Sequence, residues 1–294
     1  EARVEEHRNL GMAFFKTGMF AEAIRELRRV IELRPRDAAA RFHAGLSLLR
    51  LGQWAEAADT LRAATELRPA KGSVFHNLAY ALERLGLYED AAAALEEAGK
   101  RGLAKDSMVR TSMGIVALRR GEFAAADRWL TEARTLFDPG LPPAAWYHGA
   151  SLTAALLGDL ARANEILARG IEAYPRSAVL LNNQSVVQER LGRVEEALAT
   201  AESGLRENEE IPQLHRNVGD AHARAGRAED ALEAYLRAVK IQPGLGPDLY
   251  VRIGTIHASR SEREDAIRAF ERALELDPSN DVARTKLDDV RGQR

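Results

Sequence analysis

The stretch from Asn9 to Pro35 reads NLGMAFFKTGMFAEAIRELRRVIELRP. Its apolar residues recur at intervals of three and four, which is the period of an amphipathic helix rather than of a strand. Gly18 interrupts this pattern in the middle, and Pro35 ends it. Glycine accepts the left-handed conformation that often follows a helix, and proline cannot continue a helical hydrogen-bond ladder. The stretch therefore predicts two helices joined by a tight turn.

The same pattern returns along the chain with a period of about 34 residues, the mark of a stacked repeat array. Related strings are NLAYALERLGLYEDAAAALEEA at 77–98, NVGDAHARAGRAEDALEAYLRAVKIQP at 217–243 and AIRAFERALELDPSN at 266–280. One alanine marks each copy, at Ala23, Ala57, Ala91, Ala126, Ala163, Ala197, Ala231 and Ala266. Five residues earlier stand Gly18, Gly52, Gly86, Gly121, Gly158, Gly192, Gly226 and, in the eighth place, Ser261. A third set of small residues comprises Gly11, Gly45, Ala79, Gly114, Ser151, Ser185, Gly219 and Gly254.

These strings resemble the tetratricopeptide repeat, and the resemblance covers residues 4 to 280. It implies an all-α fold, a right-handed superhelical solenoid of helix-turn-helix repeats. The whole of 1–294 is then expected to be one solenoid that ends in a capping helix at 281–294. We place the repeats at 4–37, 38–71, 72–106, 107–143, 144–177, 178–211, 212–246 and 247–280. Proline is expected to end the second helix at Pro35, Pro69, Pro175, Pro243 and Pro278.

Two repeats depart from the pattern. The fourth ends in the longest linker, 138–143, which either tilts the two halves of the array or only lengthens a turn. The sixth carries Gln184 and Gln188 where other repeats have mostly apolar residues, and Ala201 and Gly204 where others have bulkier ones. Because a buried amide without partners costs roughly 1–3 kcal/mol, this repeat is either a soft point or a polar pocket.

Composition limits the classes of function. The net charge of −2 over 294 residues does not favour nucleic acid or an anionic membrane as a partner. No apolar run approaches the roughly 18 residues of a membrane span. The absence of cysteine rules out disulfides and thiolate metal sites. The excess of arginine over lysine is typical of a GC-rich bacterial genome. The chain begins without methionine, so we expect it to be a piece of a longer protein with repeats or another domain upstream; a cytoplasmic location is expected, and a periplasmic one stays open.

No motif for catalysis emerges. The seven histidines form no H-E-x-x-H zinc arrangement, and no glycine-rich phosphate loop is present. Carboxylate pairs such as Glu195-Glu196 fall near the start of second helices, where they complement the helix dipole. We therefore expect no catalytic, cofactor-binding or metal-binding residues, and no enzyme activity in this chain.

The resemblance implies that the first helix of each repeat lines a concave groove with its second, fifth, sixth, ninth, twelfth and thirteenth residues. Six thirteenth positions are basic: Lys16, Arg50, Arg84, Arg119, Arg190 and Arg224. The sixth positions include Asn9, His43, Asn77, Asn183, Asn217 and Arg252. Further groove residues are Arg8, Asn182 and Arg216 at fifth positions, with Tyr80, Ile115 and Val186 as apolar anchors.

This groove suits an extended, acidic protein segment, because arginine grips a carboxylate with two hydrogen bonds and asparagine both donates to and accepts from a peptide backbone. The alternative is that these residues only reflect the family consensus, since a cation also stabilises the last turn of a helix. Some members of the family hold a partner's terminal carboxylate with a basic–asparagine clamp. The first three repeats break this clamp at Met12, His43 and Ser73. A looser candidate comprises Asn183, Arg216, Asn217 and Arg252.

The expected function is a non-catalytic scaffold that binds a protein segment in its groove, with no nucleic acid, no membrane insertion and no cofactor. One alternative is the substrate-recruiting array of a larger enzyme, such as a glycosyltransferase or methyltransferase. Another is self-assembly into a homo-oligomer through an uncapped N-terminal end, where Met12 and Phe15 lie near the start.

Overall fold

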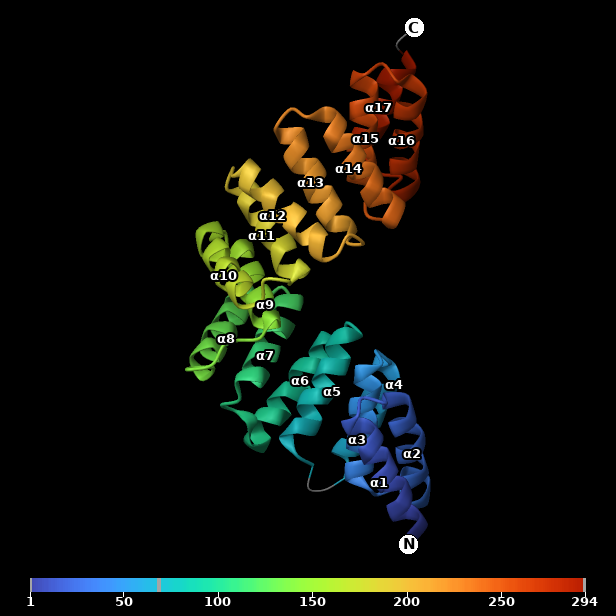
Figure 1. Ribbon diagram of the computed structural model, residues 1–294, viewed down its shortest axis with the longest axis vertical. Helices are drawn as coiled ribbons and strands as arrows, with labels where there is room; N and C mark the ends of the chain where they lie inside the picture. The colour runs from blue at the N-terminus through green and yellow to red at the C-terminus, as the bar shows by residue number, and fades with distance from the viewer. Residues whose placement is uncertain (1, 68–69, 293–294) are drawn as a thin grey trace. The chain divides into compact units, whose positions relative to one another are not determined.

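The computed structural model describes residues 2–67 and 70–292, and within these the fold is all-α, with seventeen α-helices and no strand (Figure 1). The predicted fold class, an all-α helical solenoid, is confirmed. The first four helices are α1 (Ala2–Lys16), α2 (Phe20–Leu33), α3 (Ala38–Arg50) and α4 (Trp54–Thr65). Next come α5 (Gly72–Arg84), α6 (Tyr88–Ala98), α7 (Ser107–Arg119), α8 (Phe123–Leu136), α9 (Ala144–Leu156) and α10 (Leu160–Ala173). The chain ends with α11 (Ala178–Arg190), α12 (Val194–Glu207), α13 (Pro212–Arg224), α14 (Ala228–Ile241), α15 (Pro247–Ser259), α16 (Arg263–Leu276) and α17 (Asp281–Gly292).

The helices fall into two compact units, Glu1–Thr153 and Ala154–Arg294, with the boundary inside α9. We call them unit 1 and unit 2 and describe each by itself. Within each unit, consecutive helices pack against each other, as α3 does on α4 and α13 on α14. A single solenoid over the whole chain, and a tilt at the linker 138–143, stay predictions.

The turn inside each helix pair follows the glycine positions. Seven glycines there have a positive φ between 71° and 87°: Gly18, Gly52, Gly86, Gly121, Gly158, Gly192 and Gly226. In the first turn the amide of Met19 donates to the carbonyl of Phe14 at 2.9 Å, which is the wide hydrogen bond of a Schellman motif. In the eighth pair Ser261 adopts the same conformation with φ 61°. The serine therefore keeps the turn in a backbone region that disfavours a side chain.

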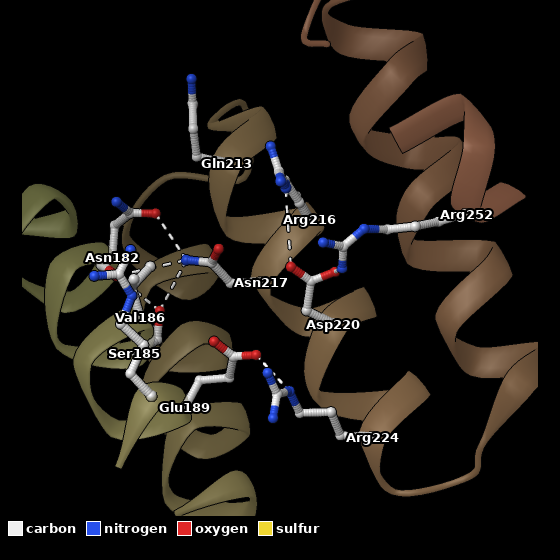
Figure 2. A pocket seen from close by; sticks show the side chains of 11 residues that line it. Asn182, Ser185, Val186, Glu189, Gln213, Arg216, Asn217, Asp220, Arg224 and Arg252 are labelled. Carbon is white, nitrogen blue, oxygen red and sulfur yellow. Dashed lines mark hydrogen bonds and ion pairs between the residues drawn. The ribbon is translucent and has the colours of Figure 1, made fainter. Parts of the chain in front are cut away.

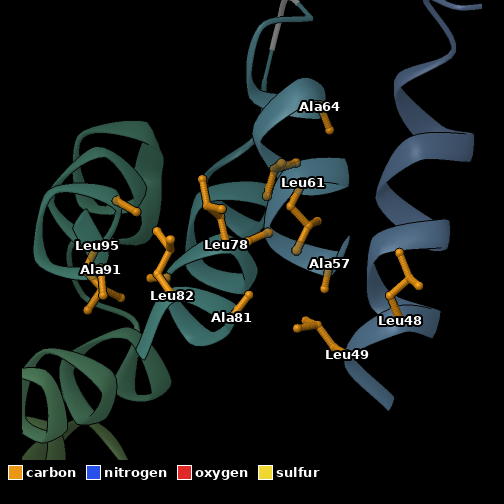
Figure 3. Packing of buried hydrophobic residues seen from close by; sticks show 14 of the residues in the cluster. Leu48, Leu49, Ala57, Leu61, Ala64, Leu78, Ala81, Leu82, Ala91 and Leu95 are labelled. Atoms are coloured by element: carbon orange, nitrogen blue, oxygen red, sulfur yellow. The ribbon is translucent and has the colours of Figure 1, made fainter. Parts of the chain in front are cut away.

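Small residues allow the two helices of a pair to cross closely. Each of the eight alanines is at most 3% exposed. The cluster in unit 1 shows the arrangement: Ala57 and Ala91 lie among leucines such as Leu61 and Leu95 (Figure 3). Elsewhere in the pairs, a glycine takes the place where a large side chain passes, as Gly45 does at Leu61. The third set of small residues, which includes Gly45, thus also allows the two helices of a pair to approach closely.

In four repeats the second helix ends just before the proline that was predicted to end it. The second helices that precede Pro35, Pro175, Pro243 and Pro278 each end two residues before the proline, as predicted. Pro69 lies outside the described residues. The third repeat has no such proline; there α6 continues into a π-helical segment, Gly99–Leu103, in which Gly102 has a positive φ of 96°.

The sixth repeat is polar inside. Gln188 on α11 is only 7% exposed. Among the described residues its Oε1 finds no hydrogen-bond partner. Gln184 is half-buried and donates to Oδ1 of Asn164 at 3.4 Å, a long contact. An unpartnered buried amide oxygen supports the soft-point interpretation over a fully bonded polar pocket.

The last helix covers the end of the final pair. Ala283, Leu287 and Val290 of α17 are buried, and the last two pack with Phe270 of α16. Asn280 caps α17 by accepting a hydrogen bond from the amide of Ala283 at 2.9 Å. These apolar residues of α17 thus pack within unit 2.

Candidate functional site

The residues predicted to line the groove lie on the first helices of the pairs. We call them the inner stripe, defined as the residues at the fifth, sixth, ninth and thirteenth positions of each repeat, which lie on α1, α3, α5, α7, α9, α11, α13 and α15. The fifth and sixth positions are four and three residues before the ninth, and the thirteenth is four residues after it, so all four lie toward one side of each helix. The chemistry of the stripe differs between the two units.

In unit 1, two basic residues of the stripe stack on aromatic rings. The guanidinium of Arg50 lies over the Phe20 ring at 4.9 Å from its centroid, and that of Arg84 lies over Trp54 at 5.1 Å. Tyr80 meets Trp54 edge-on, with ring centroids 5.9 Å apart. Each arginine thus rests on the aromatic residue that begins the second helix of the preceding pair.

A hollow of about 500 Å³ opens beside these rings. It is lined by Phe15, Leu46, Leu49, Arg50, Trp54, Asn77 and Tyr80. Tyr80 is 46% exposed, so a large apolar surface faces solvent there. Asn77 donates from Nδ2 to the carbonyl of Ser73 at 2.8 Å.

In unit 2, residues of the stripe and their neighbours on the same helices form a polar pocket of about 460 Å³ (Figure 2). Its walls come from three helices: α11 contributes Asn182, Ser185, Val186, Glu189 and Arg190, α13 contributes Gln213, Arg216, Asn217, Asp220 and Arg224, and α15 contributes Arg252. Asn217 bridges two of them, since its Nδ2 donates to Oδ1 of Asn182 at 3.0 Å and to Oγ of Ser185 at 2.9 Å. The asparagines predicted to face a ligand therefore bond to each other across α11 and α13.

Most arginines of this pocket already hold a carboxylate of the chain itself. Arg224 pairs with Glu189 at 2.5 Å, Arg216 pairs with Asp248 at 2.5 Å, and Arg252 pairs with Asp220. These pairs join neighbouring repeats. The looser clamp that includes Arg216 and Arg252 would have to break two of them before it could hold a terminal carboxylate.

The carboxylate of Asp220 contacts one hydroxyl group and two guanidinium groups. Burial raises its pKa above the usual range, although the Tyr235 hydroxyl and the guanidinium groups of Arg252 and Arg216 act to lower it. The hydroxyl of Tyr235 donates to Oδ1 at 2.7 Å. Burial and the nearby carboxylate also raise the pKa of Tyr235. This network joins α13, α14 and α15, so its contacts are structural.

The remaining basic residues of the stripe divide into paired and unpaired. In unit 1, Arg119 contacts Glu83 at 3.4 Å, and Arg8 pairs with Asp37 and Glu5. Lys16, Arg50, Arg84 and Arg190 are exposed, and in the described part of the chain none of them has a carboxylate partner.

The other residues predicted for the groove line neither the hollow of unit 1 nor the polar pocket of unit 2, and two of them contact other residues of unit 1. His43 contacts the carbonyl of Ala39 through Nδ1 at 2.8 Å and meets Phe15 edge-on. Ile115 lies beside Gly149 of α9. Asn9 and Asn183 line neither hollow.

Sequence reasoning did not single out the aromatic residues Phe20 and Trp54. A signal for them exists, because an aromatic residue stands two places after each turn glycine of unit 1: Phe20, Trp54, Tyr88 and Phe123. The corresponding residues of unit 2 are Leu160, Val194, Ala228 and Arg263. The difference between the two halves is therefore visible in the sequence.

Two further features of the structure bear on function. Residues 2–67 and 70–292 contain no group of three or more histidine, cysteine or acidic side chains placed to hold a metal ion. In the same ranges, no helix combines the length and the apolar character needed to cross a membrane.

Comparison with known families matches one model, described as tetratricopeptide repeat, at residues 8–73, 149–208 and 183–245. Two other models of the same description match residues 72–98 and 247–280, and residues 107–132. Comparison with the curated proteins gives no match.

Solved structures share the fold. The crystal structure of the Cut9–Hcn1 hetero-tetramer of the APC/C is similar with a TM-score of 0.73 and 15% identity, over 92% of this chain and 52% of that one. The chain thus spans about half the length of that relative. A tetratricopeptide repeat protein from Parabacteroides merdae is similar with a TM-score of 0.61 and 16% identity, over 99% and 100% of the two chains. At these identities the likeness extends to the fold alone.

Proposed function

Because the chain belongs to the tetratricopeptide repeat family, we propose that it is a non-catalytic scaffold that binds an acidic segment of a partner protein along its inner stripe. The observation that carries the proposal is the division of the basic residues. Arg50, Arg84 and Arg190 are exposed and, among the described residues, without a carboxylate partner. Together with Lys16, which shares these properties, they are the basic residues of the stripe available to another molecule.

Folding gives some arginines of the stripe a carboxylate partner and leaves others without one. An arginine that pairs with a neighbouring repeat gives up that pair when it binds a ligand, so its net gain is small. An unpaired arginine makes its carboxylate contact without such a loss, and its planar group binds both carboxylate oxygens. Because each exposed pair contributes only about 0.2–1 kcal/mol, several must act together. Exposed pairs are also screened at high ionic strength, so the binding is expected to weaken with salt.

The test is selection of random peptides displayed on phage by the immobilised chain. The pool enriched by the wild type should carry a net negative charge. A triple variant, Arg50→Glu with Arg84→Glu and Arg190→Glu, should lose this enrichment while its circular dichroism spectrum stays unchanged.

A matched control changes the net charge equally on second helices: Arg25→Glu with Arg62→Glu and Arg268→Glu. These arginines are 49–72% exposed and lie on α2, α4 and α16. The control should select the same acidic peptides as the wild type. The proposal would be overturned if the wild type selected peptides without an excess of acidic residues. It would also be overturned if the triple variant and the control lost the acidic enrichment equally.

Self-assembly through the N-terminal end stays a separate prediction. Leu10 on α1 is 42% exposed. Light scattering at several concentrations checks it, and a constant mass would contradict it.

A further inference from the structure

The hollow of unit 1 is built on rigid supports. Leu46 of α3 and Trp54 of α4 pack against a buried cluster that includes Leu48, Leu61 and Leu78. Trp54 is held from two sides, by the ring edge of Tyr80 and by the stacked Arg84. Side chains fixed in this way lose little conformational entropy when a ligand arrives, which favours binding by a preformed site.

The floor and the rim of the hollow differ in chemistry. Leu49 of the lining is buried with 7% exposure, whereas Tyr80 presents 46% of its surface. Arg50 belongs to the lining and Arg84 lies over the Trp54 wall, so two positive charges border an apolar depression. Stacking holds a guanidinium by one face and leaves the N–H groups at its edge free to donate.

A side-chain acceptor for a peptide backbone is also in place. Asn77 lines the hollow and donates from Nδ2 to Ser73 of its own helix. This contact fixes the amide group and leaves Oδ1 as an acceptor for a peptide N–H. The hollow therefore combines an apolar depression, two cations and one fixed acceptor within three consecutive repeats.

We propose that the hollow lined by Phe15, Leu46, Trp54 and Tyr80 holds one large apolar side chain of the partner segment, with acidic residues beside it on Arg50 and Arg84. This inference rests on the proposed function and specifies the segment it binds. Charge complementarity selects the occupant, because an apolar side chain flanked by basic residues would bring like charges to these arginines. The polar pocket of unit 2, with three of its four arginines paired, does not offer this combination.

The experiment uses the same displayed peptides with a second readout. Peptides selected by the wild type should share one leucine, isoleucine, methionine or aromatic residue at a fixed place among acidic ones. Replacing that residue by glycine in a labelled synthetic peptide should weaken binding about tenfold or more in fluorescence anisotropy.

The variant Tyr80→Ser should remove this preference while keeping the acidic one, since Tyr80 is half exposed and its loss spares the core. Tyr250→Ser is the matched control, because Tyr250 is a partly exposed tyrosine on α15, the first helix of its pair, and lines neither the hollow nor the polar pocket. It should keep the apolar preference. Acidic peptides without a fixed apolar residue, or a preference that survives Tyr80→Ser unchanged, would overturn this inference and leave the proposed function standing. Peptides that are not acidic at all would overturn both.

Discussion

Gly219 on α13 lies against the ring of Tyr235 on α14, and a Cβ built on this glycine would be 2.4 Å from two ring carbons. The same relationship joins Gly45 to Leu61 and Gly254 to Phe270. A small residue on the first helix thus faces a large one sixteen places later on the second. In the sixth repeat the two places hold Ser185 and Ala201, so the large partner is missing there.

This relationship predicts that Gly219→Ala destabilises unit 2. Tyr235 is 1% exposed and bonded to Asp220, so it cannot move away from an added methyl group. Overpacking of this kind costs about 1–3 kcal/mol, to be measured by urea unfolding. Gly244→Ala is the control, because nothing lies within 4 Å of a Cβ at that position. Equal stability of the Gly219 variant and the wild type would contradict the packing described here.

Ser261→Gly should stabilise the eighth helix pair. Ser261 has φ 61° in a turn where the other seven pairs use glycine. The left-handed conformation costs a residue with a side chain about 1–2 kcal/mol, and glycine removes this cost. The greater flexibility of glycine in the unfolded chain offsets about 0.4–1 kcal/mol of that gain. We expect a net gain of about 0.5–1 kcal/mol by thermal unfolding. The reciprocal change Gly226→Ser should lower stability, and a gain from that change would refute the argument.

Gln188→Leu should strengthen the sixth repeat. It removes a buried amide oxygen that has no hydrogen-bond partner among the described residues, and such a group costs roughly 1–3 kcal/mol. Hydrogen exchange in the wild type should be faster in 178–211 than in 38–71, and the substitution should slow it. Gln213→Leu, at an exposed position, serves as the control. Slow exchange of 178–211 in the wild type would instead mean that the glutamines are well bonded.

Asp37 should contribute stability that depends on pH. Burial acts to raise the pKa of Asp37, but the hydrogen bond from the Ala40 amide and the ion pair with Arg8 outweigh it, so the pKa lies below the usual 3.8. A carboxyl whose folded pKa is lowered stabilises the protein fully above its unfolded pKa, and the contribution disappears as pH falls through the folded pKa.

We expect Asp37→Ala to cost about 0.5–2 kcal/mol at neutral pH, because Asp37 caps α3. The difference from the wild type should shrink below about pH 4. Asp37→Asn keeps a capping oxygen and removes the charge, so it should cost less. The test is the midpoint of urea unfolding of the wild type and both variants, measured across the acidic pH range. A stability difference between Asp37→Ala and the wild type that does not change with pH would exclude the ion pair as its source.

The amino-acid sequence by itself determined the helix pairs, their turns and their close crossings. Gly18 and its equivalents act on the backbone at their own positions, and the apolar period of three and four acts within one helix. Such local effects repeat every 34 residues or so, so they could be read without a structure. The aromatic residues after the turn glycines of unit 1 were equally visible, but their meaning was not.

Only the tertiary structure decided which groove residues are free. Arg119 and Arg224 look alike in the sequence to Arg50 and Arg84, yet the first two pair with glutamates of the preceding repeat and the last two stack on aromatic rings. These partners lie about one repeat away along the chain. Whether two such side chains meet depends on the packing of one helix pair on the next, which fixes distances that no local pattern encodes.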